Sequence, residues 1–96
     1  MAAGAPVWQD EHMKITLKLF ATLEQYLPAQ RKAHNEADVE VPGGASIADV
    51  LARFGVPRDQ VHLVLLNGRF IDADSIDDVQ LAEGQALAVW PPVAGG

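Results

Sequence analysis

The hydrophobic pattern starts at Met13 and first follows the two-residue period of a β-strand. The stretch 14–21, KITLKLFA, places apolar side chains at every second position. Successive side chains of a strand point to opposite faces, so this alternation predicts a strand with one buried face. The face expected to point into the core carries Ile15, Leu17 and Leu19. The outer face carries Lys14, Thr16, Lys18 and Phe20.

A short helical segment is expected after this strand. Thr22 followed three residues later by Gln25 is typical of a helix start, and Pro28 ends the helix because it cannot continue the hydrogen-bond pattern. The apolar stripe between them consists of Leu23, Tyr26 and Leu27. Residues 29–37 have no apolar period and predict an exposed loop.

The next alternation predicts a second strand over 38–44, which the run Pro42-Gly43-Gly44 ends. Its inward side chains are Val39 and Val41.

The clearest helix is predicted over 46–55. Ser46 is a suitable N-cap and Asp49 can complete a capping box, while Gly55 suits a left-handed C-terminal stop and Pro57 follows it. The apolar positions have helical spacing and are Ile47, Val50, Leu51 and Phe54.

The remaining pattern predicts a hairpin and a last strand. An apolar run, the pair Asn67-Gly68 and a short return indicate a β-hairpin over 61–71 with a type I′ turn. The polar segment 72–84 has spaced apolar anchors and predicts a loop with one helical turn. The last strand is expected over 85–90, with Leu87 and Val89 on one face and Ala88 and Trp90 on the other.

This order of elements predicts an α+β fold. It matches the ubiquitin-like β-grasp, a mixed sheet of four to five strands with one main helix, in which the first and last strands are central and parallel. We expect a loose N-terminal arm over 1–12, the β-grasp domain over 13–91 and a flexible tail over 92–96.

Composition narrows the chemistry. The chain has 96 residues, no cysteine and a formal net charge of −6. Thiolate metal sites, disulfides and cysteine nucleophiles are therefore excluded, and an acidic surface disfavours nucleic acid as a partner. No segment has the length of a membrane span or the pattern of a signal peptide, so we expect a cytoplasmic protein without a membrane partner.

The internal polar residues do not predict an active site or a metal site. The three histidines, His12, His34 and His62, lack ligand spacing. The acidic cluster of Asp72, Asp74, Asp77 and Asp78 lacks the glycine and terminal glutamate of a calcium loop, which favours a solvated turn. Ser46 and Ser75 have no base nearby in sequence, and no Lys-Ser/Thr pair follows the glycines at 43–44 to make a phosphate loop.

The last residues are different. Val93 is the last large side chain, and Ala94, Gly95 and Gly96 are slim enough to pass through a narrow channel. Pro91 and Pro92 stiffen the exit from the last strand. The terminal carboxylate is ionised at neutral pH and can attack the α-phosphate of ATP, which would form a reactive acyl-adenylate.

These features carry a resemblance to a known family. From Met13 to Gly96 the chain resembles the MoaD/ThiS sulfur carriers, and within them the small subunit of molybdopterin synthase. The resemblance rests on the opening MKITLKLFA, the hairpin LLNGRFI, the LAEG turn and, most specifically, the ending WPPVAGG.

The resemblance implies a carrier and not an enzyme, with no bound cofactor. An ATP-dependent activating enzyme would adenylate Gly96, and a sulfurtransferase or cysteine desulfurase relay would convert it to a thiocarboxylate. The tail would then enter the large synthase subunit and donate sulfur for the dithiolene of the molybdenum or tungsten cofactor. Val93, Ala94 and Gly95 would be the threaded segment. The residues expected to dock on the partner are Trp90, Pro91, Pro92, Phe20 and Leu66.

Two features depart from the family, namely Gln85-Ala86 after the LAEG turn and Val89-Trp90 before the prolines. They leave the identity of the partner open. The alternatives are a sulfur carrier for thiamine or another pathway, a ubiquitin-like modifier that joins Gly96 to a lysine, and a passive β-grasp interaction domain.

Overall fold

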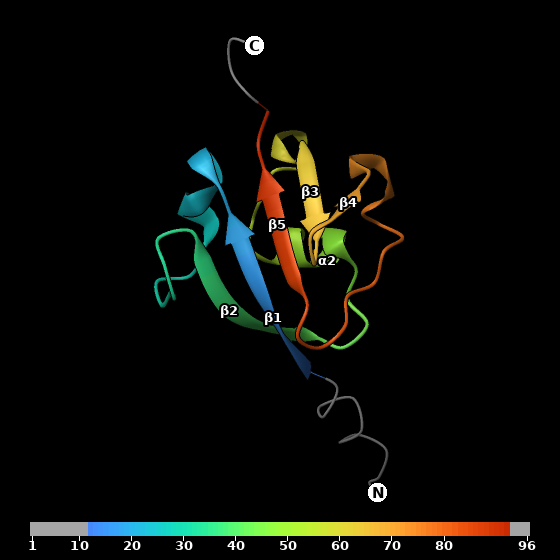
Figure 1. Cartoon of the computed structure of the whole chain (residues 1–96), viewed down its shortest axis with the longest axis horizontal. Coiled ribbons are helices and arrows are strands. Elements are labelled where there is room, and N and C mark those ends of the chain that lie inside the picture. Colours follow the sequence, from blue (N-terminus) through green and yellow to red (C-terminus); the bar gives the residue numbers. More distant parts are fainter. Residues whose placement is uncertain (1–11, 93–96) are drawn as a thin grey trace, which may run out of the picture.

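The computed structural model describes residues 12–92, which form one mixed sheet with a helix packed on one face (Figure 1). The strands are β1 (His12–Leu19), β2 (Glu36–Pro42), β3 (Leu63–Leu66), β4 (Arg69–Ile71) and β5 (Ala86–Trp90). The helix α2 (Ile47–Arg53) is accompanied by three short 3-10 helices, η1 (Ala21–Tyr26), η2 (Arg58–Gln60) and η3 (Ala73–Ser75).

The strand order is β2-β1-β5-β3-β4. Strands β1 and β5 lie side by side and run parallel, whereas the pairs β1–β2, β3–β4 and β3–β5 are antiparallel. The first and last strands are therefore central, as the element order predicted. The predicted ubiquitin-like β-grasp fold is confirmed.

One face of the sheet and the inner side of α2 form the core. The inward positions of β1 and β5 are fully buried, as their alternation predicted. Each such aliphatic side chain contributes about 1.5–3 kcal/mol when it leaves water. The largest fully buried side chains are Ile15, Leu17, Leu19, Leu23, Ile47, Ile76, Leu87, Val41, Val50, Val64 and Val89.

The predicted capping box of α2 is present. The Asp49 amide donates to Ser46 Oγ, and the Ser46 amide donates to the Asp49 carboxylate, each over 3.0 Å. Gly55 has a φ of +80° and stops the helix as predicted. The helix itself covers 47–53, a narrower range than the predicted 46–55.

The hairpin is also confirmed within narrower bounds. Asn67 and Gly68 have φ values of +50° and +82°, as a type I′ turn requires. The turn is also stabilised by two hydrogen bonds between Asn67 and Ala86 of β5. Its amide donates to the Ala86 carbonyl over 2.8 Å, and its Oδ1 accepts from the Ala86 amide over 2.7 Å.

The prediction that Thr22 caps the segment after β1 was wrong. The 3-10 helix η1 starts at Ala21, directly after the strand, and its N-cap residue Phe20 makes no side-chain capping bond. Phe20 is held in extended conformation because its amide donates to the Val89 carbonyl over 3.2 Å. The Gln25 side chain donates instead to the Thr22 carbonyl.

Strand β2 starts earlier than predicted, at Glu36. Ala37 pairs with Leu17 of β1 and is fully buried, although the sequence around it is polar and reads as a loop. The register with β1 therefore extends the strand beyond its own hydrophobic pattern. His12, which we assigned to the N-terminal arm, is the first residue of β1.

Candidate functional site

The candidate site lies where β5 ends. This strand runs between β1 and β3 (Figure 1), and Trp90 is its last residue. The Trp90 carbonyl accepts from the His62 amide over 3.0 Å, and Trp90 pairs with Leu63 across the strands. Pro91 is half-buried and Pro92 is exposed. The backbone is therefore tied to the sheet up to Trp90 and leaves it at the two prolines.

Phe20 and Trp90 stack on each other. Their ring centroids lie 4.2 Å apart and their planes differ by 1°. Phe20 follows β1 and Trp90 closes β5, so the parallel pairing of these strands brings together two residues that are distant in sequence. Both rings are half-buried, which leaves part of the stacked pair accessible at this end of the sheet.

The stacked pair is part of a larger apolar surface on the sheet face opposite α2. Leu63 and Leu65 alternate with the buried residues of β3 and so point outward. Leu65 pairs with Ala88 on one side and with Phe70 on the other, and Phe70 is 65% exposed. We call this the outer apolar surface. It consists of Phe20, Leu63, Leu65, Phe70 and Trp90, whereas Ala88 on the same face is buried.

The same sheet face is polar on its other half. Strand β1 contributes Lys14, Thr16 and Lys18, and they pair with Glu40, Asp38 and Glu36 of β2. The Thr16 hydroxyl donates to the Asp38 carboxylate over 2.8 Å. The boundary between the two halves therefore runs between β1 and β5.

The structure brings Phe20, Trp90 and the two prolines to one end of the sheet and separates Leu66 from them. Leu66 is only 8% exposed and belongs to the core cluster, where it pairs with Leu87. Its assignment to a partner-facing surface was wrong. The run VHLVLL contains too few polar residues to show which alternate positions face the core. Pairing with β5 determines which of its side chains point inward.

Sequence reasoning missed Leu63, Leu65 and Phe70. The two-residue turn at Asn67-Gly68 places Leu65 opposite Phe70, since the length of the turn determines the partners. It does not determine which face those partners occupy. That face follows from β5, where the alternation of Leu87 and Val89 with Ala88 and Trp90 was correctly predicted.

Val93, Ala94, Gly95 and Gly96 lie outside the described residues. The chain length still limits where they can act. Six peptide bonds join Trp90 to Gly96, and an extended chain spans at most about 3.6 Å per residue, so the chain length allows at most about 22 Å between the two residues. Any centre that reacts with Gly96 must come this close to the outer apolar surface.

The internal polar residues have local structural roles. Asp72 accepts from the Asp74 amide at the start of η3, and Asp77 accepts from both terminal nitrogens of Arg58, over 2.7 and 3.4 Å. This hydrogen bonding lowers the pKa of Asp77 below its ordinary 3.8 and raises the pKa of Arg58. Across 12–92, no three His, Cys, Asp or Glu side chains gather as a metal site would require.

His62 is exposed on the loop before β3, with its backbone amide bonded to Trp90. No helix between residues 12 and 92 has the length and apolarity needed to cross a membrane.

Comparison with known proteins agrees with this fold. The solution structure of HVO 2177 from Haloferax volcanii is 27% identical, with a TM-score of 0.68 over 97% of this chain and 99% of that protein. The crystal structure of SAMP1 from the same organism is 25% identical, with a TM-score of 0.57 over 86% and 99%. A protein assigned as molybdopterin converting factor subunit 1 from Pyrococcus furiosus is 24% identical, with a TM-score of 0.58 over 84% and 99%, and shows the shared fold.

No curated protein sequence matches the chain. The family model described as Mut7-C ubiquitin matches residues 12–95, which includes every described strand and helix and extends to Gly95. The resemblance to the MoaD/ThiS carriers is thereby confirmed as a shared ubiquitin-like fold. The chain belongs to the Mut7-C ubiquitin family.

Proposed function

We propose that this ubiquitin-like protein is a sulfur carrier that is activated at Gly96. The observation that supports the proposal is the link between Trp90 and the chain end. Trp90 is held by the sheet and by Phe20, and the sequence runs from it through Pro91-Pro92 and Val93-Ala94 to Gly95-Gly96. A partner that binds the outer apolar surface would thus hold a slim, carboxylate-tipped segment within reach of its own reactive centre.

The chemistry takes two steps. A Gly96 carboxylate oxygen attacks the α-phosphorus of ATP and displaces pyrophosphate, which forms the acyl-adenylate. Sulfur at the oxidation level of sulfide then attacks the carbonyl carbon and AMP leaves, which gives the thiocarboxylate. The partners in this scheme are an ATP-dependent activating enzyme and a sulfurtransferase or cysteine desulfurase relay, whose persulfide sulfur is reduced to the sulfide level by a thiol that becomes a disulfide. The carrier itself holds no cofactor and supplies the acyl group.

We further propose that the receiving partner is the large subunit of molybdopterin synthase. The ending WPPVAGG and the chain's own resemblance to the small subunit of that enzyme support this pathway. In that role the protein is a co-substrate and not the enzyme, and it delivers one sulfur atom each time it is loaded. We also propose that the protein acts in the cytoplasm.

A second candidate is a ubiquitin-like modifier. The similarity to SAMP1, a name that stands for small archaeal modifier protein 1 in its Methanosarcina acetivorans counterpart, favours it. A modifier would use the same activation of Gly96, but a lysine amine would then displace AMP. The product would be an isopeptide-linked protein and not a thiocarboxylate.

The test is the intact mass of the protein after incubation with ATP, a MoaD/ThiS-type activating enzyme and a sulfide donor, followed by iodoacetamide. The exchange of oxygen for sulfur adds the mass of one oxygen atom, which methionine oxidation would also add. Alkylation removes the ambiguity because the chain has no cysteine. We expect one alkyl group at Gly96 in the natural chain and none in a chain extended by alanine after Gly96.

An equally alkylated extended chain would contradict the proposal, as would an unlabelled natural chain in a reaction where another carrier is labelled. Isopeptide-linked products in a cell extract, without labelling, would favour the modifier. An N-terminal one-residue extension is the matched control, and it should be labelled like the natural chain.

A further inference from the structure

The edge of strand β2 has unpaired backbone groups. In its antiparallel pairing with β1, alternate residues of β2 direct their amide and carbonyl toward β1 or away from it. Glu36 directs both outward, because its amide donates to the Ala33 carbonyl and its carbonyl accepts from the Lys32 and Ala33 amides. By the same alternation, Asp38 and Glu40 present their amides and carbonyls to the open edge. Within residues 12–92 these groups have no backbone partner beyond the strand.

The open stretch has defined ends. On one side the bridge between Ala33 and Glu36 occupies the edge. On the other side Pro42 has no amide hydrogen, and its carbonyl already accepts from the Ala45 amide over 3.2 Å. The exposed slot is therefore short and offers two donors and two acceptors, at Asp38 and Glu40. A free edge of this kind is a template for an added strand.

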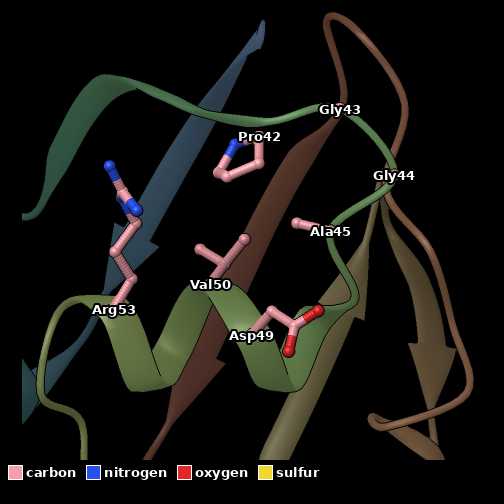
Figure 2. Close-up of a pocket in the computed structure, with 7 residues that line it drawn as sticks. All are labelled: Pro42, Gly43, Gly44, Ala45, Asp49, Val50 and Arg53. Carbon is pink, nitrogen blue, oxygen red and sulfur yellow. The ribbon is translucent and has the colours of Figure 1, made fainter. Parts of the chain in front are cut away.

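A groove runs along the helix side of this edge. One hollow of about 290 Å³ lies between α2 and the loop after β2 (Figure 2). In Figure 2 Val50 points from the helix toward Pro42, and Arg53 points toward strand β2. A second hollow continues past Val39 and Phe54 to Pro28, and both are lined by Arg53. The first hollow is at the lower limit of small-molecule pockets, so the side chains of an extended segment suit the groove better.

The charge pattern indicates what kind of segment fits. Across the outer sheet face, lysines of β1 pair with acids of β2, Lys14 with Glu40 and Lys18 with Glu36. A strand added beside the acidic β2 would therefore be basic on this face, since opposite charges stabilise cross-strand pairs and like charges destabilise them. A second copy of β2 would place acidic residues beside acidic residues. The formal net charge of −6 also favours a basic partner.

We propose that β2 binds an extended segment of a partner protein in which basic residues alternate with apolar ones. The segment adds a strand beside Asp38–Pro42. Its basic side chains lie beside Asp38 and Glu40, and its apolar side chains enter the groove between β2 and α2. This site is on the sheet edge away from β5, so it is independent of the proposed carrier function at Gly96. Both surfaces can be occupied at once.

The probe is the peptide acetyl-Lys-Val-Lys-Val-Lys-amide, titrated into the isotope-labelled full chain and followed by NMR. We expect saturable shifts and slowed hydrogen exchange at the amides of Asp38 and Glu40. In the antiparallel register that we propose, lysines lie opposite Asp38 and Glu40, so the lysine amides bond to β2 and the valine amides point away. N-methylation of the middle lysine should abolish binding, and N-methylation of a valine should leave it. The acidic analogue with glutamates should not bind.

Two variants test the edge from the protein side. Glu40→Pro removes one outward donor, while Glu40→Thr removes the same charge and keeps the donor. We expect Glu40→Pro to bind about fivefold to tenfold more weakly than Glu40→Thr, as the loss of one hydrogen bond predicts. If Glu40→Pro fails to fold, the N-methylated peptides decide. Equal binding of the two N-methylated peptides, shifts confined to the outer apolar surface, or no shifts at millimolar peptide would each overturn the proposal.

Discussion

The rings of Phe20 and Trp90 are parallel and 4.2 Å apart, and they join the end of the first strand to the end of the last. The pair links the sheet to the residues that lead toward Gly96. It lies at one end of the outer apolar surface, so it contributes both to folding and to the surface that a partner would bind.

The stacking should contribute measurably to stability. We expect a double-mutant cycle of Phe20→Leu and Trp90→Leu to give a coupling of about 0.5–1.5 kcal/mol in the free energy of unfolding, since aromatic pairs exceed the effect of their buried area by this amount. Urea denaturation of the four proteins measures it. Additive single effects, within about 0.3 kcal/mol, would show that the rings touch without stabilising each other.

Phe70 should matter for partner binding more than for folding. It is 65% exposed and lies in the outer apolar surface. Phe70→Asp is therefore expected to change the free energy of unfolding by less than about 0.5 kcal/mol, as surface substitutions usually do. It should also lower the rate of thiocarboxylate formation at Gly96, or of sulfur delivery. Arg69→Asp, at the neighbouring exposed position, is the matched control. Equal rates for the natural chain and Phe70→Asp in both reactions would remove the outer apolar surface from the docking site.

The capping box should stabilise α2. Ser46→Ala removes the oxygen that accepts from the Asp49 amide, and we expect the free energy of unfolding to fall by about 1 kcal/mol. Ser46→Thr keeps a hydroxyl and should retain most of the stability. Thermal and urea unfolding compare the variants. An unchanged midpoint for Ser46→Ala would mean that water replaces the cap at no cost.

Gly68 is required by its backbone conformation and not by space. Its φ is +82°, and a Cβ added there would meet nothing within 4 Å. Gly68→Ala should therefore cost about 1 kcal/mol, all of it from the left-handed conformation. Gly68→Asn should cost less, because asparagine tolerates this region better. Equal losses of stability in both variants would point to another cause.

The ion pair of Arg58 and Asp77 should make the stability of the folded protein depend on pH only at acidic pH. The pKa of Asp77 is lowered in the folded protein, mainly by hydrogen bonding to Arg58. The contribution of Asp77 to stability is thus present above its ordinary pKa of 3.8 and is lost as the pH falls through the lower folded value. Arg58→Ala should raise the pKa of Asp77 toward 3.8, as followed by NMR of its carboxyl carbon. Arg53→Ala is the control and should leave it unchanged. A pKa that stays low in Arg58→Ala would assign the shift to another group.

Local sequence patterns were sufficient to predict the elements whose residues are close together in the chain. The alternation of Ile15, Leu17 and Leu19 predicted the buried face of β1, and Ser46 with Asp49 predicted the start of α2. Asn67-Gly68 predicted the hairpin turn because few other pairs adopt its positive φ values. The order of these elements predicted the β-grasp.

The tertiary structure decided what depends on partners distant in the chain. Pairing with Leu17 makes Ala37 part of a strand that its own neighbours do not predict. Pairing with β5 turns Leu66 into the core and Leu63 and Leu65 outward, because an unbroken apolar run has no phase of its own. The parallel alignment of β1 with β5 brings Phe20 onto Trp90, and the antiparallel register with β1 leaves Asp38 and Glu40 on an open edge. The sequence by itself determined most of the elements, because each has a local pattern, whereas register determined which side chains share a surface.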